Sequence, residues 1–119
     1  MSIILYGIPN CDTIKKARKW LAAENIDYQF HDYRKDGISA SLVESFCSEL
    51  EWNNVLNKRG TTYRQLEQTQ KDNLTEETAV DLLVQYPAMI KRPILSVDNH
   101  LYLGFSPEKY STIFSTQSL

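Results

Sequence analysis

The sequence of 119 residues has the length of one ordinary domain, and with 42% hydrophobic and 24% charged residues its composition is globular rather than disordered or fibrous. A formal net charge of −2 provides no overall positive field, so we expect no nucleic-acid partner. The lack of a signal peptide or membrane-spanning stretch and the presence of only two cysteines favour a reduced, cytoplasmic protein with no membrane partner, disulfide framework or metal site.

The first third of the chain predicts a strand, a helix and a second strand. The continuous apolar run at 2–8 is typical of a strand that is covered on both faces. Over 12–24, apolar residues recur at helical spacing with basic residues on the other side, which predicts an amphipathic helix. Polar and apolar residues alternate over 26–33, as in a strand. Together these elements predict a parallel, right-handed crossover unit.

The middle of the chain predicts only helices. A capping box from Ser41 to Glu44 predicts a helix that runs to about residue 50. Short helical turns flank the polar loop at 57–62. A longer helix is expected to start near Thr75 and to end at 86–87, where a proline follows.

The end of the chain predicts a hairpin and a closing helix. The segments 93–97 and 100–104 have the composition of strands, and the two residues between them suit the loop of an antiparallel hairpin. Ser106 then provides an N-cap and Pro107 a first helical residue. The complete order is βαβ, a helical block and ββα.

This order predicts an α/β protein with a thioredoxin-like fold. Its mixed four-stranded sheet would be interrupted by an all-helical insertion at about 38–90. We expect residues 1–119 to form one such domain, because the sequence contains no repeat, no low-complexity segment and no linker.

Cys11 stands where the first strand gives way to the first helix. There the unpaired backbone N–H groups and the positive end of the helix dipole favour a thiolate over a thiol. A buried, inert side chain is the commoner situation for cysteine. The flanking residues are loop and capping types, however, and Asn10 or Thr13 could donate to the sulfur or cap the helix. We therefore expect a reactive thiol, provided that the carboxylate of Asp12 points into solvent.

Lys15 lies in the first turn of the same predicted helix. There its cation could hold the thiolate or an anionic substrate, but a solvated lysine fits the position equally well. Neither His31 nor His100 has the setting of a general base, so both are interpreted as structural.

Three separated motifs resemble one known family. They are YGIPNCDTIKKA at 6–17, NKRGTTYRQL at 57–66 and MIKRPIL at 89–95. Together they resemble the arsenate reductase (ArsC)-like family, most closely its Spx/YffB-type branch, over nearly the whole chain. In that family the fold is thioredoxin-like with a helical insertion, which agrees with the order of elements given above.

The resemblance also implies a set of site residues. Cys11 would be the nucleophile, Arg59 and Arg92 would bind anions, and Pro93 would be a cis-proline that faces the thiol. The alternative for each arginine is a solvated surface side chain. Arg59 precedes a glycine in a polar loop, and Arg92 is held at the entry to a strand by the proline that follows it.

Two departures from the family pattern distinguish between its branches. Ile14 stands where the redox-switch regulators have the second cysteine of C-x-x-C, so no local disulfide can form. The resolving thiol must come from glutathione, from a partner protein or from Cys47, which is interpreted as a core residue. The segment with Phe105 after the last strand lacks the third anion-binding arginine of the arsenate reductases, and this weakens arsenate as the substrate.

These observations favour a glutathione-dependent thiol reductase that acts on a disulfide or a small oxyanion. Glutathione would be a co-substrate, with glutaredoxin as a possible partner, and no bound cofactor is expected. One alternative is an arsenate reductase coupled to glutathione and glutaredoxin. The other is a non-enzymatic regulator that binds RNA polymerase, as the Spx-type proteins do.

Overall fold

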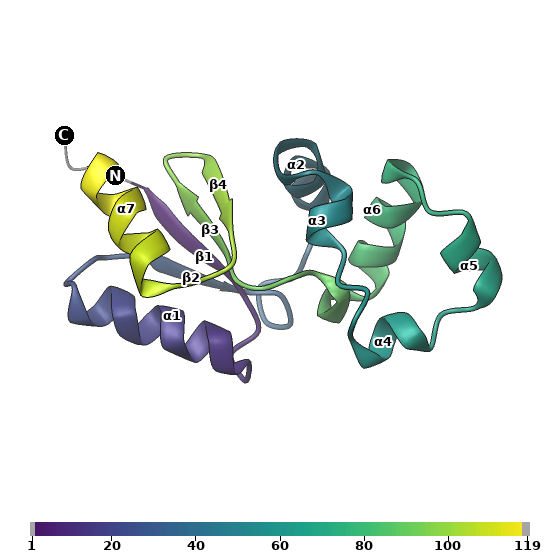
Figure 1. Ribbon diagram of the computed structural model, residues 1–119, viewed down its shortest axis with the longest axis horizontal. Helices are drawn as coiled ribbons and strands as arrows, with labels where there is room; N and C mark the ends of the chain where they lie inside the picture. Colours follow the sequence, from purple (N-terminus) through teal and green to yellow (C-terminus); the bar gives the residue numbers. More distant parts are fainter. Residues whose placement is uncertain (1, 118–119) are drawn as a thin grey trace. The chain divides into compact units, whose positions relative to one another are not determined.

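The computed structural model describes residues 2–117, and within them four strands form one mixed sheet in the order β2–β1–β3–β4 (Figure 1). The central strand β1 pairs in parallel with β2 and antiparallel with β3, and β3 pairs antiparallel with β4. The mixed four-stranded α/β sheet predicted from the sequence is therefore confirmed. The bounds are Ile3–Gly7 for β1, Gln29–Asp32 for β2, Ile94–Val97 for β3 and His100–Leu103 for β4.

The described residues divide into two compact units. The sheet unit consists of residues 2–32 and 92–117 and holds all four strands with α1 (Asp12–Ala23) and α7 (Pro107–Gln117). The helical unit consists of residues 33–91, and it includes the range of about 38–90 for which the sequence predicts an all-helical insertion.

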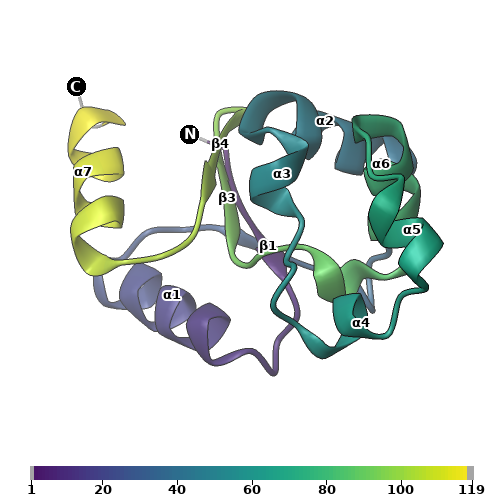
Figure 2. The same ribbon diagram turned by 45° about the vertical axis from the view of Figure 1, so that its right-hand side comes forward.

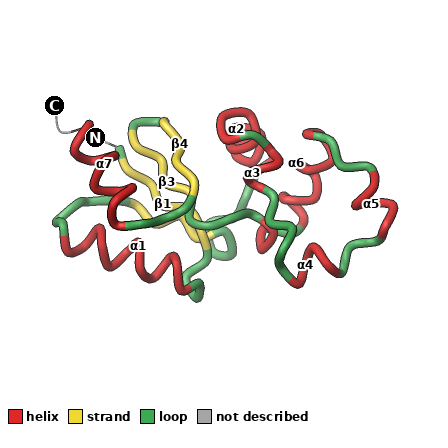
Figure 3. Tube along the Cα trace, viewed as in Figure 1, coloured by secondary structure: helices red, strands yellow, loops and turns green. Residues whose placement is uncertain are grey.

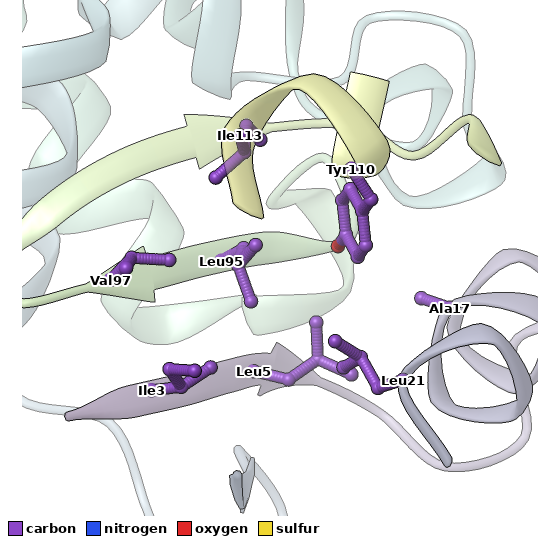
Figure 4. Close-up of a cluster of buried hydrophobic side chains, with 8 residues drawn as sticks. All are labelled: Ile3, Leu5, Ala17, Leu21, Leu95, Val97, Tyr110 and Ile113. Atoms are coloured by element: carbon purple, nitrogen blue, oxygen red, sulfur yellow. The ribbon is translucent and has the colours of Figure 1, made fainter. Parts of the chain in front are cut away.

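Both helices of the sheet unit cover the same face of the sheet (Figure 2). Opposite residues in a ladder share a face, so the β1–β3 register brings four apolar side chains to that face. α1 and α7 add four more buried side chains, and removing such groups from water stabilises the unit by roughly 25 cal/mol per Å² of apolar surface. The cluster consists of Ile3, Leu5, Ala17, Leu21, Leu95, Val97, Tyr110 and Ile113 (Figure 4).

The regular elements of the helical unit are helices (Figure 3). An isolated β-bridge also joins Leu56 to Ile90. The two longest helices of the unit, α2 and α6, lie against each other and bury one face each. The predicted helical character of the middle of the chain is confirmed. The elements are α2 (Ala40–Leu50), α3 (Trp52–Val55), α4 (Thr61–Arg64), α5 (Gln68–Asp72), α6 (Glu76–Gln85) and the 3₁₀ turn η1 (Pro87–Met89).

The start of α2 corrects one prediction. Ser39, not Ser41, is the N-cap, because its hydroxyl accepts the N–H of Leu42 at 3.1 Å and its carbonyl accepts the N–H of Val43 at 3.1 Å. Both serines have the chemistry of a cap. The residue with extended backbone is Ser39, however, and Ser41 already lies within the helix, so the Ser41–Glu44 capping box does not form.

Two further elements differ from the predictions. The strand expected over 26–33 is shorter and spans Gln29–Asp32. The N–H of Ile26 donates to the carbonyl of Leu21 at 3.0 Å, so it bonds back to α1 and not to the sheet. The short helix α5 was not expected, since Gln68–Asp72 has no apolar residue and therefore no helical periodicity. Its signal is instead the reciprocal capping box formed by Glu67 and Gln70.

Across residues 2–117 we find no helix that combines the length and the apolar character needed to cross a membrane.

Candidate functional site

Cys11 is the N-cap of α1, as its sequence position predicts. Its backbone is extended, its N–H donates to Ile8 at 3.3 Å, and its carbonyl accepts the N–H of Lys15 at 3.0 Å. The thiol is free and partly exposed, and it makes no capping hydrogen bond. Because the first N–H groups of a helix have no acceptor within the helix, the Cys11 sulfur stands at an end of α1 that favours negative charge.

The turn at Cys11 is held near the sheet by the packing of Gly7 at the end of β1 against Ile14 in α1. Gly7 ends β1 and is buried, and a side-chain carbon at this position would overlap Cδ1 of the fully buried Ile14. A residue without Cβ at position 7 leaves room for the Ile14 side chain between α1 and the strand. Ile8 is also buried, so the turn is anchored on both sides of the exposed Pro9 and Asn10.

The neighbours of Cys11 are placed as follows. Asp12 and Lys15 are exposed, so the carboxylate of Asp12 lies in solvent, as a reactive thiol requires. Asn10 is exposed and Thr13 is half-buried. Cys11 is the N-cap of α1 and no side chain among the described residues caps this helix, so the capping role predicted for Asn10 or Thr13 is wrong. No hydrogen bond joins either side chain to Cys11 in the part of the chain that the structure describes, and their contact with a substrate stays a prediction.

The register of the sheet brings Arg92 and Pro93 to the same sheet end as the Cys11 turn. Tyr6 is paired with Ile94, and the two strands are antiparallel, so the residue that follows Tyr6 and the residue that precedes Ile94 are neighbours. The Arg92–Pro93 peptide bond is cis. Pro93 is buried and its carbonyl accepts the N–H of Gly104 at 2.9 Å, whereas Arg92 is half-buried.

The segment after β4 reaches the same end of the sheet but carries no arginine. The cation nearest in sequence is Lys109, and its ammonium donates to the carbonyl of Leu103 at the end of β4. This lysine is thus engaged with the backbone of its own hairpin. Lys109 therefore does not compensate for the departure from the arsenate reductase pattern around Phe105.

Arg59 belongs to the helical unit, in the loop between α3 and α4, and is exposed. Its N–H donates to Oδ1 of Asn57 at 3.0 Å, and its carbonyl lies 3.4 Å from the guanidinium of Arg64. A cavity of ≈ 310 Å³ adjoins it, and Lys58 and Lys91 also line this cavity. The sequence pattern does not identify these two lysines as site residues, although they directly precede Arg59 and Arg92.

Cys47 is unsuited to act as a resolving thiol. It lies on α2 and is only 2% exposed. Burial raises the pKa of the Cys47 thiol from its ordinary 9.0 to about 11, with a smaller contribution from the negative charge of Glu76. At neutral pH the group is therefore protonated and a poor nucleophile. Its interpretation as a core residue is confirmed.

Two further features concern histidine and metal binding, namely the contacts of His31 and the grouping of side chains that could hold a metal ion. His31 is paired with Tyr6 across β1 and β2, with ring centroids 5.1 Å apart, which is a structural contact. Within residues 2–117, no three His, Cys, Asp or Glu side chains are grouped so that they could hold a metal ion.

Solved structures similar to this chain share its fold. A structure titled as the YFFB protein has a TM-score of 0.89 at 43% identity and covers 93% of this chain and 97% of its own. An arsenate reductase (ArsC) related protein from Brucella melitensis has a TM-score of 0.77 at 44% identity, with 96% and 95% of the two chains covered. The thioredoxin-like fold class predicted from the order of elements is confirmed.

Similar sequences include both a close and a distant relative. An uncharacterized protein from Haemophilus influenzae is 42% identical over 113 residues, with 95% of this chain and 99% of the relative covered. The global transcriptional regulator Spx 1 from Lactococcus lactis is 26% identical, with 90% and 84% covered. The model of the ArsC family matches residues 6–113. The chain therefore belongs to the ArsC family.

Proposed function

We propose that this protein is a glutathione-coupled thiol reductase with Cys11 as its single nucleophile. The observation that carries the proposal is the contrast between the two thiols. Cys11 is partly exposed at the start of α1, where negative charge is favoured, while Cys47 is buried and protonated at neutral pH. A single available thiol without a local partner calls for an external resolving thiol.

The reaction takes two balanced exchange steps. The Cys11 thiolate attacks the glutathione sulfur of a mixed disulfide, so a Cys11–glutathione disulfide forms and the substrate leaves as a thiolate that takes up a proton. A second glutathione, as thiolate, then attacks the glutathione sulfur of that adduct. Oxidised glutathione leaves and the Cys11 thiolate is regenerated. In the net exchange the sulfur of the incoming glutathione is oxidised and the substrate sulfur is reduced, and the proton of that glutathione passes to the substrate thiolate. The glutathionyl sulfur of the mixed disulfide only moves from the substrate to Cys11 and then into oxidised glutathione.

Arg92 and Arg59 are proposed to hold anionic groups of the substrate or of glutathione. Arg92 lies at the end of the sheet where the Cys11 turn lies, and a guanidinium matches a carboxylate with two parallel hydrogen bonds. Asn10, Thr13 and Lys15 are proposed as further contacts around the sulfur, and Pro93 as the residue that shapes the site. A reduced cytoplasm, which contains glutathione and glutaredoxin, is the setting that this chemistry requires.

The test compares Cys11→Ser with the matched control Cys47→Ala. Both variants lose one thiol, but only the first removes the proposed nucleophile. We expect Cys11→Ser to reduce a glutathione mixed disulfide no faster than the uncatalysed background, and Cys47→Ala to stay within about threefold of the parent. Unchanged turnover by folded Cys11→Ser would refute the proposal.

Arsenate reduction is a second candidate, supported by family membership and by the 44% identity to an arsenate reductase related protein. The nucleophile would be the same and would form a thiol–arsenate adduct. The missing third arginine argues against it, because a compact oxyanion gains most from several converging donors. Steady-state turnover of arsenate with glutathione and glutaredoxin would establish this candidate, and no turnover above background would remove it.

A regulatory role is a third candidate, supported by the 26% identity to Spx 1 over 90% of this chain. Ile14 removes the local disulfide switch, but a buried isoleucine at this position does not by itself remove a surface that binds the polymerase. Recovery of purified RNA polymerase in a pull-down with this protein, unaffected by Cys11→Ser, would favour it. Failure to bind at micromolar concentrations would count against it.

A further inference from the structure

The basic cavity of the helical unit contains Arg59, which is proposed above to hold an anion, together with two lysines to which the proposed function gives no central role. It is lined by Asn53, Leu56, Lys58, Arg59 and Lys91. The lining includes three cations and no carboxylate, although residues 33–91 as a whole contain more acidic than basic side chains. None of the three cations forms an ion pair with any residue that the structure describes. An anion that enters the cavity would therefore meet three positive charges without displacing a carboxylate.

A backbone bridge brings the two parts of this lining together. The N–H of Asn57 donates to Met89 at 2.8 Å, and the N–H of Lys91 donates to Val55 at 2.8 Å, on either side of the Leu56–Ile90 bridge. Four of the residues in these two segments, Val55, Leu56, Met89 and Ile90, are at most 1% exposed. Lys58 and Lys91 are therefore held on one cavity although they are far apart in the sequence.

The loop that carries Lys58 and Arg59 is also held in shape. Oδ1 of Asn57 accepts the N–H of Arg59 at 3.0 Å, and a Cβ at Gly60 would stand only 3.3 Å from the Asn57 amide nitrogen. The Lys58 ammonium lies 6.0 Å from the centre of the Trp52 ring, within reach of a cation–π attraction. These contacts lower the conformational entropy that a ligand would otherwise have to remove on binding.

The size and the charges of the cavity define the class of ligand. Its volume of ≈ 310 Å³ is at the lower end of small-molecule sites and is larger than one tetrahedral oxyanion needs. Arginine binds a planar carboxylate with two donors, and each lysine adds a point charge. The helical unit also has an acidic cavity between α2 and α6, whose lining includes Glu44, Glu76, Glu77 and Asp81, and its charge would repel the same ligand.

We propose that the basic cavity binds a small organic anion with at least two carboxylates, and that Lys58 and Lys91 bind it together with Arg59. The inference rests on the proposed function only for the role of Arg59. Lys58 and Lys91 are specificity residues that distinguish a doubly carboxylated ligand from a neutral one of the same size.

The experiment uses S-methylglutathione, which has two carboxylates but no thiol, and the full chain with Cys11→Ser. Binding is followed by calorimetry and by the amide resonances of residues 57–60 and 91. We expect Lys58→Ala and Lys91→Ala each to raise Kd by roughly two- to fivefold, the range for an exposed ion pair. The exposed Lys35, which does not line the cavity, provides the control variant Lys35→Ala, and its Kd should not change.

Two results would overturn the inference. One is equal Kd values for S-methylglutathione and its dimethyl ester, and the other is tighter binding of inorganic phosphate than of S-methylglutathione. Because binding is measured without the Cys11 thiol, the two proposals fail separately. Binding as expected, together with full reductase activity in Cys11→Ser, would refute the proposed function and leave the basic cavity standing.

Discussion

Gly7 at the end of β1 lies so close to Ile14 of α1 that a side-chain carbon at position 7 would overlap Cδ1 of the isoleucine. This contact joins the central strand to the first turn of the helix that begins at Cys11. Both residues are buried, so neither can move into solvent to make room.

The first prediction is that Gly7→Ala destabilises the protein by about 1–3 kcal/mol, the usual range for overpacking a filled core. The free energy of unfolding is measured by urea denaturation. Ile14→Val removes Cδ1 and costs about 0.5–1.5 kcal/mol by itself. The double variant should lose less stability than the sum of the two single losses, because removal of Cδ1 partly relieves the overlap with the new side-chain carbon. Strict additivity would contradict the contact.

The second prediction concerns pH and Cys47. Because burial raises the pKa of the folded thiol from 9.0 to about 11, the stability that it contributes is complete below pH 9 and is lost as the pH rises toward 11. The free energy of unfolding should fall over this window by roughly 2 kcal/mol more in the parent than in Cys47→Ala. Parallel pH profiles for the two proteins would show that Cys47 is accessible in the folded state.

The third prediction separates two serines that the sequence does not distinguish. Ser39→Ala should cost about 1 kcal/mol of stability, because the N–H of Leu42 loses its acceptor at the start of α2. Ser41→Ala is the matched control and should be neutral or slightly stabilising, since alanine favours a helix more than serine does. Thermal unfolding of both variants decides the matter, and the reverse order of effects would place the cap at Ser41.

The fourth prediction concerns Tyr110 on α7. Its hydroxyl is buried without a hydrogen-bond partner among the described residues. Its ring packs edge-on against the ring of Phe105, with the two ring centroids 4.7 Å apart. Burial raises the pKa of this phenol. Tyr110→Phe keeps the ring and removes the unsatisfied hydroxyl, so it should leave stability unchanged or raise it by up to about 1 kcal/mol. Tyr110→Leu should lower stability, and a large loss in Tyr110→Phe would reveal a missing partner.

Much of the sheet unit could be predicted from the sequence because its signals are local. The apolar run of β1, the helical period of α1 and the short loop of the β3–β4 hairpin each lie within one segment. The same holds for Cys11, whose place at a helix start follows from the residues around it. Where two local solutions compete, as for Ser39 and Ser41, hydrogen bonds to particular N–H groups decide, and the pattern does not show them.

The basic cavity could not be predicted because long-range pairing creates it. The Leu56–Ile90 bridge brings Lys58 and Lys91 to one cavity. The short segments around the bridge carry no sequence pattern that predicts this pairing. The sequence singles out Arg59 and Arg92 by resemblance, and it is the fold that assigns Arg59 to the helical unit and Arg92 to the entry of β3. Their shared function in one reaction stays a proposal.

The role of Cys11 as nucleophile can be tested by intact-mass analysis of Cys47→Ala after brief exposure to a glutathione mixed disulfide and then to reduced glutathione. We expect one glutathione per chain, located on Cys11 by peptide mapping, and its removal by reduced glutathione as fast as the enzyme turns over. An absence of any adduct at Cys11, or an adduct that is released more slowly than turnover, would contradict the assignment of Cys11 as the nucleophile.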